Sequence, residues 1–458
     1  MRKSLIKFAP LALAAFVGAA FADDPDGVQL YGILDVGVAN VQHTYNFDPS
    51  FPVSQSPIPQ DTRLKSATGM ISGGLSQSRW GLKGQEHLGS GLKAIFKLES
   101  AVNVPTGNVS NAAAGVANNS GCMAPFNPNN PHPGTTTCTG SLDSAISGQL
   151  FSRGAFAGIS SDSWGTVTAG RNTSFFLDNM AITDPLGEAQ DFSPLGYSGS
   201  YGGGGETDDS RVDNSIKYSI PVGDFTFGAL YKFGGVAGSS TAQTAYQLDA
   251  VYLHGPLSVM GGFESFKDAF TDFGIGQGSG GTLFPHGSGT PGTLGVNAVN
   301  TKAFLLSAEY DLGKTSLHGG YEREELSNPS NPGSDNIGSL FGYPVGAVNT
   351  NPFGGATKLQ NVLWFGANQH VTSAFTLSAA VYHINVPAYG NGTGGAAAGN
   401  VNYYTLLADY RFTVLTDLYA GIMKDNASGG QAVVTYPWAS SAPGYSNRII
   451  AIGMRHAF

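Results

Sequence analysis

The connections between strand-like segments alternate strictly between short and long along this sequence. Segments of about ten residues repeat a two-residue alternation of apolar and polar side chains, which is typical of β-strands. Sixteen such segments are predicted: 29–37, 79–85, 92–99, 149–160, 165–171, 211–220, 225–233, 246–253, 257–266, 303–310, 315–324, 359–369, 375–385, 403–412, 416–424 and 446–458. Seven of the connections are tight turns, and eight are mostly longer and rich in Gly, Pro, Asn and Ser. This connectivity predicts a 16-stranded antiparallel transmembrane β-barrel with one rim of short turns and one rim of long loops.

The composition favours a single all-β domain. The chain contains 65 Gly, 27 Phe and 19 Tyr, and only 12% of its residues are charged, so strong helix formers are scarce. No linker and no shift in composition divides the sequence. Beyond the N-terminal segment, no apolar run approaches the roughly 18 residues that a membrane-spanning helix needs.

The first 22 residues have the features of a cleavable signal peptide. Arg2, Lys3 and Lys7 precede an apolar stretch, 8–21, and Ala20-Phe21-Ala22 offers a small-x-small cleavage site. We therefore expect export, with the barrel domain spanning 23–458. Loss of three bases and no acids changes the net charge from −9 to −12 (−9 − 3), and so acidic a chain is not expected to bind nucleic acid.

In the predicted strand 92–99 the charged residues fall on one face. In strand 92–99 apolar residues take alternate positions, and Lys93, Lys97 and Glu99 lie between them. A Lys or Arg that faces lipid at mid-depth costs about 2–4 kcal/mol, so these side chains are expected to face inward. Five bases are predicted on inward positions of neighbouring strands: Arg79, Lys83, Lys93, Lys97 and Arg153. Because a dry core could not hold them, the interior is expected to contain water and to form a channel.

The connection 172–210 is the most unusual one. It has 39 residues and seven acids but no base, and Arg171 and Arg211 flank it. The acids and the glycine run 202–205 would suit a solvated hairpin tip. A free loop, however, could not bury its apolar residues, which are Phe175, Phe176, Leu177, Met180, Ile182 and Leu186. A long connection without a strand of its own is often functional, and a loop folded inside the barrel is the alternative.

Two cysteines, Cys122 and Cys138, lie in the long connection 105–148. In an exported protein a disulfide is the default expectation. A metal site is the alternative, but the one nearby histidine, His132, would provide three ligands at best, without a recognisable spacing. We predict a disulfide within one subunit, and no metal or other cofactor.

Several segments resemble the general porins of Gram-negative bacteria, specifically the proteobacterial trimeric type. The similarity covers the mature chain in six blocks that follow the order of the family: 30–37, 78–96, 151–171, 213–218, 416–419 and 453–458. The most recognisable are Ser78-Arg-Trp-Gly-Leu-Lys-Gly84 and Phe151-Ser-Arg-Gly-Ala-Phe-Ala-Gly158. The C-terminus, Gly453-Met-Arg-His-Ala-Phe458, resembles the insertion signal of the family, whose final Phe is read by the barrel-insertion machinery.

The resemblance implies a homotrimer among the lipids of the outer membrane, carrying ions and small hydrophilic solutes passively through a water-filled pore. It also implies that 172–210, the third long loop, folds into the barrel and narrows it. The basic cluster of the family maps onto Arg79 and Arg153, with Lys83, Lys93 and Lys97 nearby. Four loop acids are expected to face it: Asp178, Asp184, Glu188 and Asp191. The sequence departs from the family in its enlarged second loop, 105–148, and in Val414-Leu-Thr-Asp417, where a basic residue usually precedes Thr.

No catalytic motif was found. The chain lacks G-x-S-x-G and H-E-x-x-H, so an enzyme is not expected, and an outer-membrane hydrolase is the enzymatic alternative. A substrate-specific outer-membrane channel, such as one for sugars, is the nearer alternative. It should carry a run of aromatic residues along the lumen, whereas the predicted inward positions are charged or small. A purely structural or adhesive role would give no solute flux in a swelling assay.

Overall fold

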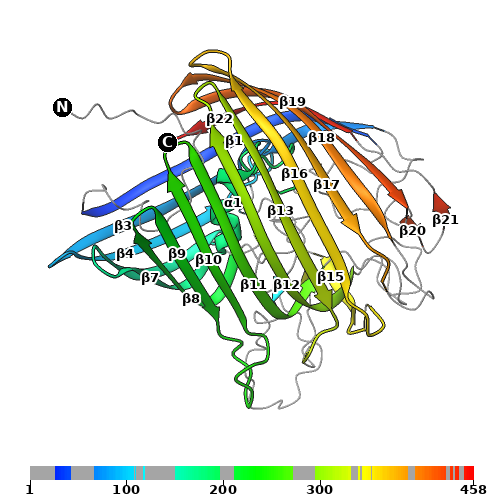
Figure 1. Ribbon diagram of the computed structural model, residues 1–458, viewed down its shortest axis with the longest axis horizontal. Helices are drawn as coiled ribbons and strands as arrows, with labels where there is room; N and C mark the ends of the chain where they lie inside the picture. Colours follow the sequence, from blue (N-terminus) through cyan, green and yellow to red (C-terminus); the bar gives the residue numbers. More distant parts are fainter. Residues whose placement is uncertain are drawn as a thin grey trace.

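The computed structural model describes residues 26–42, 66–107, 109, 117–118, 150–195, 211–271, 294–331, 339–340, 343–351, 353–389, 398–429, 434–436, 439–442 and 448–458. Most of these residues form one sheet that curls into a barrel (Figure 1). Within the described ranges, sixteen strands form the wall: β1 (Gly27–Val41), β3 (Arg79–Gly89), β4 (Leu92–Ala101), β6 (Gly154–Ser161), β7 (Gly165–Thr173), β8 (Arg211–Val222), β9 (Phe225–Lys232), β10 (Ala245–His254), β11 (Leu257–Thr271), β12 (Leu294–Asp311), β13 (Thr315–Ser327), β16 (Lys358–His370), β17 (Phe375–Val386), β18 (Gly399–Thr413), β19 (Thr416–Gly429) and β22 (Arg448–Ala457).

Each wall strand pairs antiparallel with the next one along the chain. The last strand, β22, pairs with β1, with Met454 opposite Val36, and this pairing closes the barrel. The predicted 16-stranded antiparallel barrel is therefore confirmed. Two strands begin five or more residues away from their predicted start. β12 begins at Leu294 rather than at 303, and β6 begins at Gly154 rather than at 149, which leaves Arg153 just before the strand.

The remaining elements of the described ranges are short. They are β2 (Ala67–Ser72), β5 (Ala117–Asn118), β14 (Ser339–Leu340), β15 (Tyr343–Asn349), β20 (Val434–Tyr436), β21 (Ala439–Ala442) and the helix α1 (Phe175–Thr183). None of the helical residues that the structure describes forms a helix long and apolar enough to cross a membrane. The predicted signal peptide, 1–22, and both cysteines, Cys122 and Cys138, lie outside the described residues.

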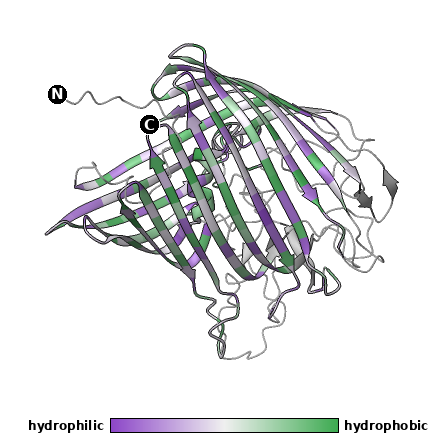
Figure 2. Ribbon diagram, in the orientation of Figure 1, coloured by the Kyte–Doolittle hydropathy of each residue, from purple (hydrophilic) through white to green (hydrophobic). Residues whose placement is uncertain are grey.

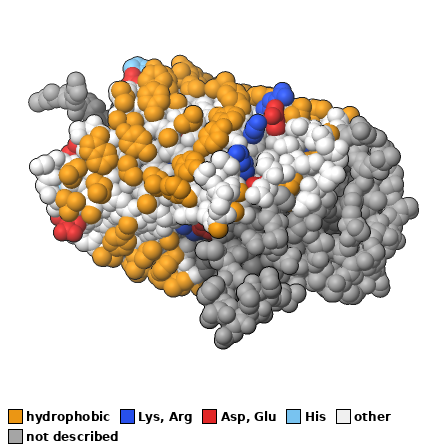
Figure 3. All heavy atoms as spheres, turned by 90° about the horizontal axis from the view of Figure 1, so that it is seen from below, with side chains coloured by type: hydrophobic (Ala, Val, Ile, Leu, Met, Phe, Trp, Pro, Cys, Tyr) orange, Lys and Arg blue, Asp and Glu red, His pale blue; other side chains and the backbone are white. Residues whose placement is uncertain are grey.

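The wall has an apolar outer face, and its inner face carries buried apolar residues as well as polar and charged ones. On β16, Leu363 and Phe365 are 49% and 60% exposed, whereas Val362 and Trp364 between and beside them are buried. Figure 2 shows this alternation as stripes along the strands, and Figure 3 shows apolar side chains spread over the outer surface. Because the period of a strand is two residues, the same alternation places buried charged residues such as Glu322 and Glu324 of β13 inside, whereas Arg323 and Glu325 between and beside them face outward.

One wall position is built from two segments. The first part of β1 pairs with β3, from Gly27 to Ile33, and its second part pairs with β2, from Val36 to Val41. Between β2 and β3, residues 73–78 leave the sheet and turn into the barrel, and Gly73 permits the turn with a φ of 91°. The sequence did not predict β2 or this inward segment.

Candidate functional site

The described part of the connection 172–210 lies inside the barrel. Its helix α1 packs against β10, β11, β12 and β13 (Figure 1). The helix begins at Ser174, whose side-chain oxygen accepts a hydrogen bond of 3.0 Å from the backbone N–H of Leu177, as is usual for an N-cap. The inward-folded loop predicted above is confirmed, and the solvated hairpin tip is excluded for residues 172–195. We call residues 172–195 the constriction loop, after the role predicted for the connection 172–210 from the sequence.

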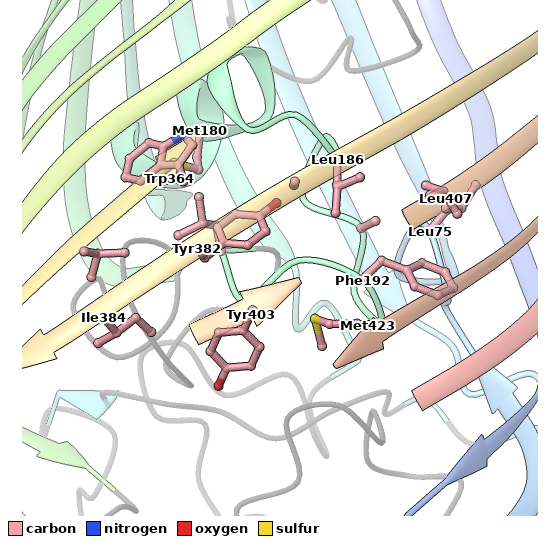
Figure 4. Close-up of a cluster of buried hydrophobic side chains, with 14 of the residues drawn as sticks. Leu75, Met180, Leu186, Phe192, Trp364, Tyr382, Ile384, Tyr403, Leu407 and Met423 are labelled. Carbon is pink, nitrogen blue, oxygen red and sulfur yellow. The ribbon is translucent and has the colours of Figure 1, made fainter. Parts of the chain in front are cut away.

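Apolar side chains of the constriction loop bury themselves against the inner wall. Met180, Leu186 and Phe192 belong to one buried cluster with Trp364, Tyr382 and Leu407 of the wall (Figure 4). Phe192 also meets the edge of the Tyr419 ring, with centroids 6.1 Å apart. The loop therefore covers the inward aromatic residues of β16, β17 and β19.

Hydrogen bonds attach the constriction loop to the wall along its length. The Thr183 and Ser307 hydroxyls are 2.8 Å apart, and the indole N–H of Trp364 donates to the carbonyl of Thr183 at 3.2 Å. Further along, the Thr405 hydroxyl donates to the carbonyl of Phe192 at 2.8 Å. These bonds come from β12, β16 and β18 of one stretch of the wall, so the loop is held at several points.

Two of the four predicted loop acids, Asp178 and Asp184, have buried side-chain partners on the wall. Asp178 forms an ion pair with Lys217 of β8. Asp184 accepts hydrogen bonds from the phenol of Tyr382 at 2.6 Å and from the backbone N–H of Glu188 at 2.7 Å. Burial raises the pKa of the Asp184 carboxyl, although these hydrogen bonds oppose the rise.

Asp191 is the most isolated of the loop acids. Its backbone N–H donates to the carbonyl of Gly74 at 3.1 Å, but its Oδ2 atom is buried without a hydrogen bond from any residue that the structure describes. Burial raises the pKa of the Asp191 carboxyl well above its usual range, and repulsion from Asp35 adds to the rise. Glu188, the fourth acid, is half-buried, with a positive φ of 57°.

Three of the five predicted bases converge around one acid on the opposite wall. The carboxylate of Glu99 on β4 accepts a hydrogen bond of 2.8 Å from the Nε atom of Arg153. Its other oxygen lies 3.2 Å from the Nζ atom of Lys97. Arg79 is close enough to interact electrostatically with both Glu99 and Arg153. The phenol of Tyr31 donates to Glu99 at 2.8 Å. We call Arg79, Lys97, Glu99 and Arg153 the charged wall cluster.

The other two predicted bases lie on the same inner face but nearer the short-turn rim. Lys83 stands opposite Lys97 in the register of β3 and β4, and Lys93 stands opposite His87 next to the turn. The structure thus groups the five bases on neighbouring strands but brings together only three. Their function as a pore constriction remains a prediction.

Sequence reasoning missed several residues of this interior. Glu99 was recognised as inward-facing but not as the centre of the base cluster, and its position among inward bases was the available signal. Arg211, next to the loop, is buried, and its guanidinium donates to Gln77 of the inward segment at 3.4 Å. Arg171 forms a 2.6 Å ion pair with Asp213. The sequence indicates only that Arg171 and Arg211 flank an acidic loop.

Asp35 is a further residue whose role the sequence did not predict. Its carboxylate accepts hydrogen bonds from the backbone N–H groups of Gly74, Leu75 and Ser76, at 3.2, 2.9 and 2.8 Å. It therefore holds the inward segment 73–78, to which the constriction loop is bonded through Gly74. Because the residues involved lie far apart in sequence, no local pattern reveals this contact.

Chemically, the interior combines fixed charges of both signs with polar side chains. Among the described residues, no three His, Cys, Asp or Glu side chains are grouped so that they could hold a metal ion. The arrangement suits the passage of water and of dissolved charged or polar molecules.

Comparison with known proteins gives consistent results. A family model described as Gram-negative porin matches residues 9–430. An outer membrane porin of Bordetella pertussis is 32% identical over 274 residues, which cover 57% of this chain and 58% of that protein. The match thus spans less than two thirds of the length of this relative. The major outer membrane protein P.IB of Neisseria meningitidis serogroup B is 38% identical over 104 residues, covering 23% of this chain and 25% of that one.

Solved structures resemble the whole chain. The anion-selective porin from Comamonas acidovorans has a TM-score of 0.60 at 20% identity, covering 94% of this chain and 99% of that one. OmpT, an outer membrane protein of Vibrio cholerae, has a TM-score of 0.54 at 14% identity, covering 94% and 97%. At these identities the structural similarity establishes the fold alone.

Proposed function

The chain belongs to the family of Gram-negative porins, and on that basis we propose that it is a general diffusion porin, which passes ions and small hydrophilic solutes through a water-filled pore in the outer membrane. The observation that carries the proposal is the charged wall cluster, because Arg153, Lys97 and Glu99 lie on the inner face of a barrel whose outer face is apolar. Charges inside such a barrel are compatible with a lumen filled with water.

The general diffusion function is favoured over a substrate-specific channel by the position of the inward aromatic residues. Trp364, Tyr382 and Tyr419 are at most 4% exposed, because the constriction loop covers them. A specific channel for sugars would need such rings along the open passage. Liposome swelling with neutral sugars of one size but different stereochemistry tests this point, since a general porin admits them at equal rates.

For the constriction, we propose that Arg79, Lys97 and Arg153 face the solute across the lumen from the constriction loop, with Lys83 and Lys93 on the path towards the short-turn rim. Among the described residues, Asp178 is paired with Lys217, and Asp184 and Asp191 are 1% exposed, so these acids present little charge to the lumen. The basic side of the constriction is then the stronger one, and we propose a preference for anions. The similar fold of the anion-selective porin from Comamonas acidovorans is compatible with this preference.

The remaining features of the mature protein are also proposals. They are cleavage after residue 22, a homotrimer, a disulfide between Cys122 and Cys138 that stiffens the second long loop, and recognition of Phe458 by the barrel-insertion machinery. Bridging a loop of this size is worth about 3 kcal/mol in the chain-entropy model. Alkylation and mass analysis of the unreduced protein would refute the disulfide by finding two free thiols.

The decisive experiment is conductance in a planar bilayer. The purified mature protein should form channels whose conductance rises with salt concentration and that close in three steps, because each subunit of a trimer conducts. Absence of conductance from correctly folded protein would overturn the channel function. Single isolated steps would overturn only the trimer.

A further inference from the structure

Four glycines of the inner wall lie directly beneath the constriction loop. We call them the seat glycines, and they occupy four strands along the path of the loop: Gly228 of β9, Gly262 of β11, Gly366 of β16 and Gly421 of β19. Each lies opposite an apolar side chain of the loop. The partners are Phe175, Phe176, Pro185 and Phe192, in the same order.

No larger residue fits at these positions. A Cβ atom at Gly228 would lie 2.4 Å from the ring of Phe175, and one at Gly262 would lie 2.6 Å from the ring of Phe176. The corresponding distances are 2.5 Å from Gly366 to Pro185 and 2.6 Å from Gly421 to Phe192. All four are below the 3.0 Å that real Cβ contacts essentially never violate.

The backbone dihedral angles give no reason for glycine at these four positions, although at Gly366 a Cβ would also lie 2.6 Å from the backbone oxygen of Ala379. None of the seat glycines has a positive φ, so another residue could adopt the same backbone conformation. Glycine inside a strand weakens it and often marks a place where another part of the chain approaches closely. Here the close approach is that of the loop, since Phe175, Phe176 and Phe192 are at most 4% exposed.

A neighbouring wall position serves the same purpose indirectly. A Cβ at Gly320 of β13 would lie 2.2 Å from the indole of Trp364. Because Gly320 leaves this space, the indole lies against the wall and donates its hydrogen bond to Thr183 of the loop. Absence of a wall side chain therefore recurs at several of the points where the loop contacts the wall.

We propose that the seat glycines are positioning residues that set how far the constriction loop projects into the lumen, and hence the width of the pore. The inference rests on the proposed channel function. A side chain at a seat would displace its partner from 2.4–2.6 Å towards the 3.4 Å at which ordinary contact begins. The wall cannot yield, because each seat strand is bonded to a neighbour on either side. The loop must therefore move into the passage.

The test compares two adjacent glycines of β11 in the full-length protein. Gly262→Ala should lower the single-channel conductance and slow the entry of larger sugars in liposome swelling. Gly261→Ala is the matched control, because its Cβ would face outward and meet only Leu306 and Leu305, at 3.7 and 3.8 Å. It should leave both quantities unchanged. Neither substitution alters the fixed charge of the pore, so a change in conductance cannot be attributed to a change in charge.

A double substitution separates pore width from folding defects. In a Phe176→Ala background the ring that Gly262→Ala would strike is absent, so adding Gly262→Ala should leave the conductance of Phe176→Ala unchanged. The same logic applies to Gly228→Ala with Phe175→Ala, because the three atoms nearest to a Cβ at Gly228 all belong to the ring of Phe175. Equal conductance of wild type and Gly262→Ala would overturn the inference while leaving the channel function intact. A fall in conductance of the same size when Gly262→Ala is added to wild type and to Phe176→Ala would overturn it as well. If Gly262→Ala did not fold, failure of Phe176→Ala to restore folding would overturn it as well. A wild-type protein without conductance would instead overturn the proposed function.

Discussion

The phenol of Tyr419 on β19 donates a hydrogen bond of 2.7 Å to the carboxylate of Asp35 on β1, across the strand that closes the barrel. The same carboxylate receives three backbone N–H groups of the inward segment 73–78. The Tyr419 ring also meets Phe192 of the constriction loop. Asp35 thus connects the closure of the barrel to one end of the loop.

Asp35→Asn should destabilise the protein by about 2–3 kcal/mol, because the amide presents an N–H group where a carboxylate oxygen had accepted two hydrogen bonds. It should also increase the current noise of the open channel, since the inward segment that holds Asp191 becomes less firmly attached. Thermal unfolding in detergent and bilayer recordings measure the two effects. Asp224→Asn, at an exposed turn, is the control. An Asp35→Asn variant with the melting temperature and the open-channel current noise of wild type would contradict this assignment.

Asp191 should make stability dependent on pH. Its pKa in the folded protein lies well above the value of about 4 expected in the unfolded chain, so the folded protein holds the proton more tightly. The stabilisation is complete below the unfolded pKa and is lost as the pH rises through the folded pKa. Asp191→Asn, which cannot ionise, should therefore match wild type near pH 4 and become increasingly more stable than wild type as the pH rises. Melting temperatures of both proteins over this range provide the measurement, and a constant difference would contradict it.

The strands could be predicted because their signal is local. Alternation with a period of two residues marks a wall strand wherever one face meets lipid, and strict alternation of connection lengths fixes the order. The inward segment 73–78 could not be predicted in this way. Its structure depends on Asp35, some forty residues away, and its own sequence, Gly73-Gly-Leu-Ser76, suggests only a turn.

The loop acids show the same limit. The sequence indicated that the loop was acidic and that it carried apolar residues to bury, and both features are explained by its place inside the barrel. Whether an acid meets water or a buried partner depends on distant residues. Tyr382, which binds Asp184, is 198 positions away, and Ser307, which contacts Thr183, is 124 positions away. The sequence could therefore predict that the loop lies inside, but not which of its acids remain charged.

Glu99→Gln should shift the reversal potential further towards anions. The substitution removes the acid around which Arg79, Lys97 and Arg153 gather, and leaves three bases on the inner wall without their counter-charge. Reversal potentials in a salt gradient measure the shift. Glu325→Gln is a matched control, because this acid lies on the outer face beside Arg323. An unchanged reversal potential for Glu99→Gln would show that the charged wall cluster does not line the path of the ions.

Neutralising Arg79 and Arg153 together should shift the reversal potential towards cations. Two unit charges about 8 Å apart in water interact by only roughly 0.5 kcal/mol, so one residue cannot make the pore strictly selective, whereas several can bias it by about tenfold. Physiological salt screens over about the same distance, so the shift should shrink as salt rises.

The opposite double substitution, Asp184→Asn with Glu188→Gln, should shift the reversal potential towards anions. Most of this shift should come from Glu188, because Asp184 is buried against Tyr382 and its pKa is raised, so it contributes less charge to the lumen. The two single variants separate these contributions, and Arg323→Gln on the outer face is the control for both double substitutions. If the reversal potential stayed the same in both double variants, the narrowest part of the pore would lie elsewhere. The constriction loop and the charged wall cluster would then not form the selectivity site.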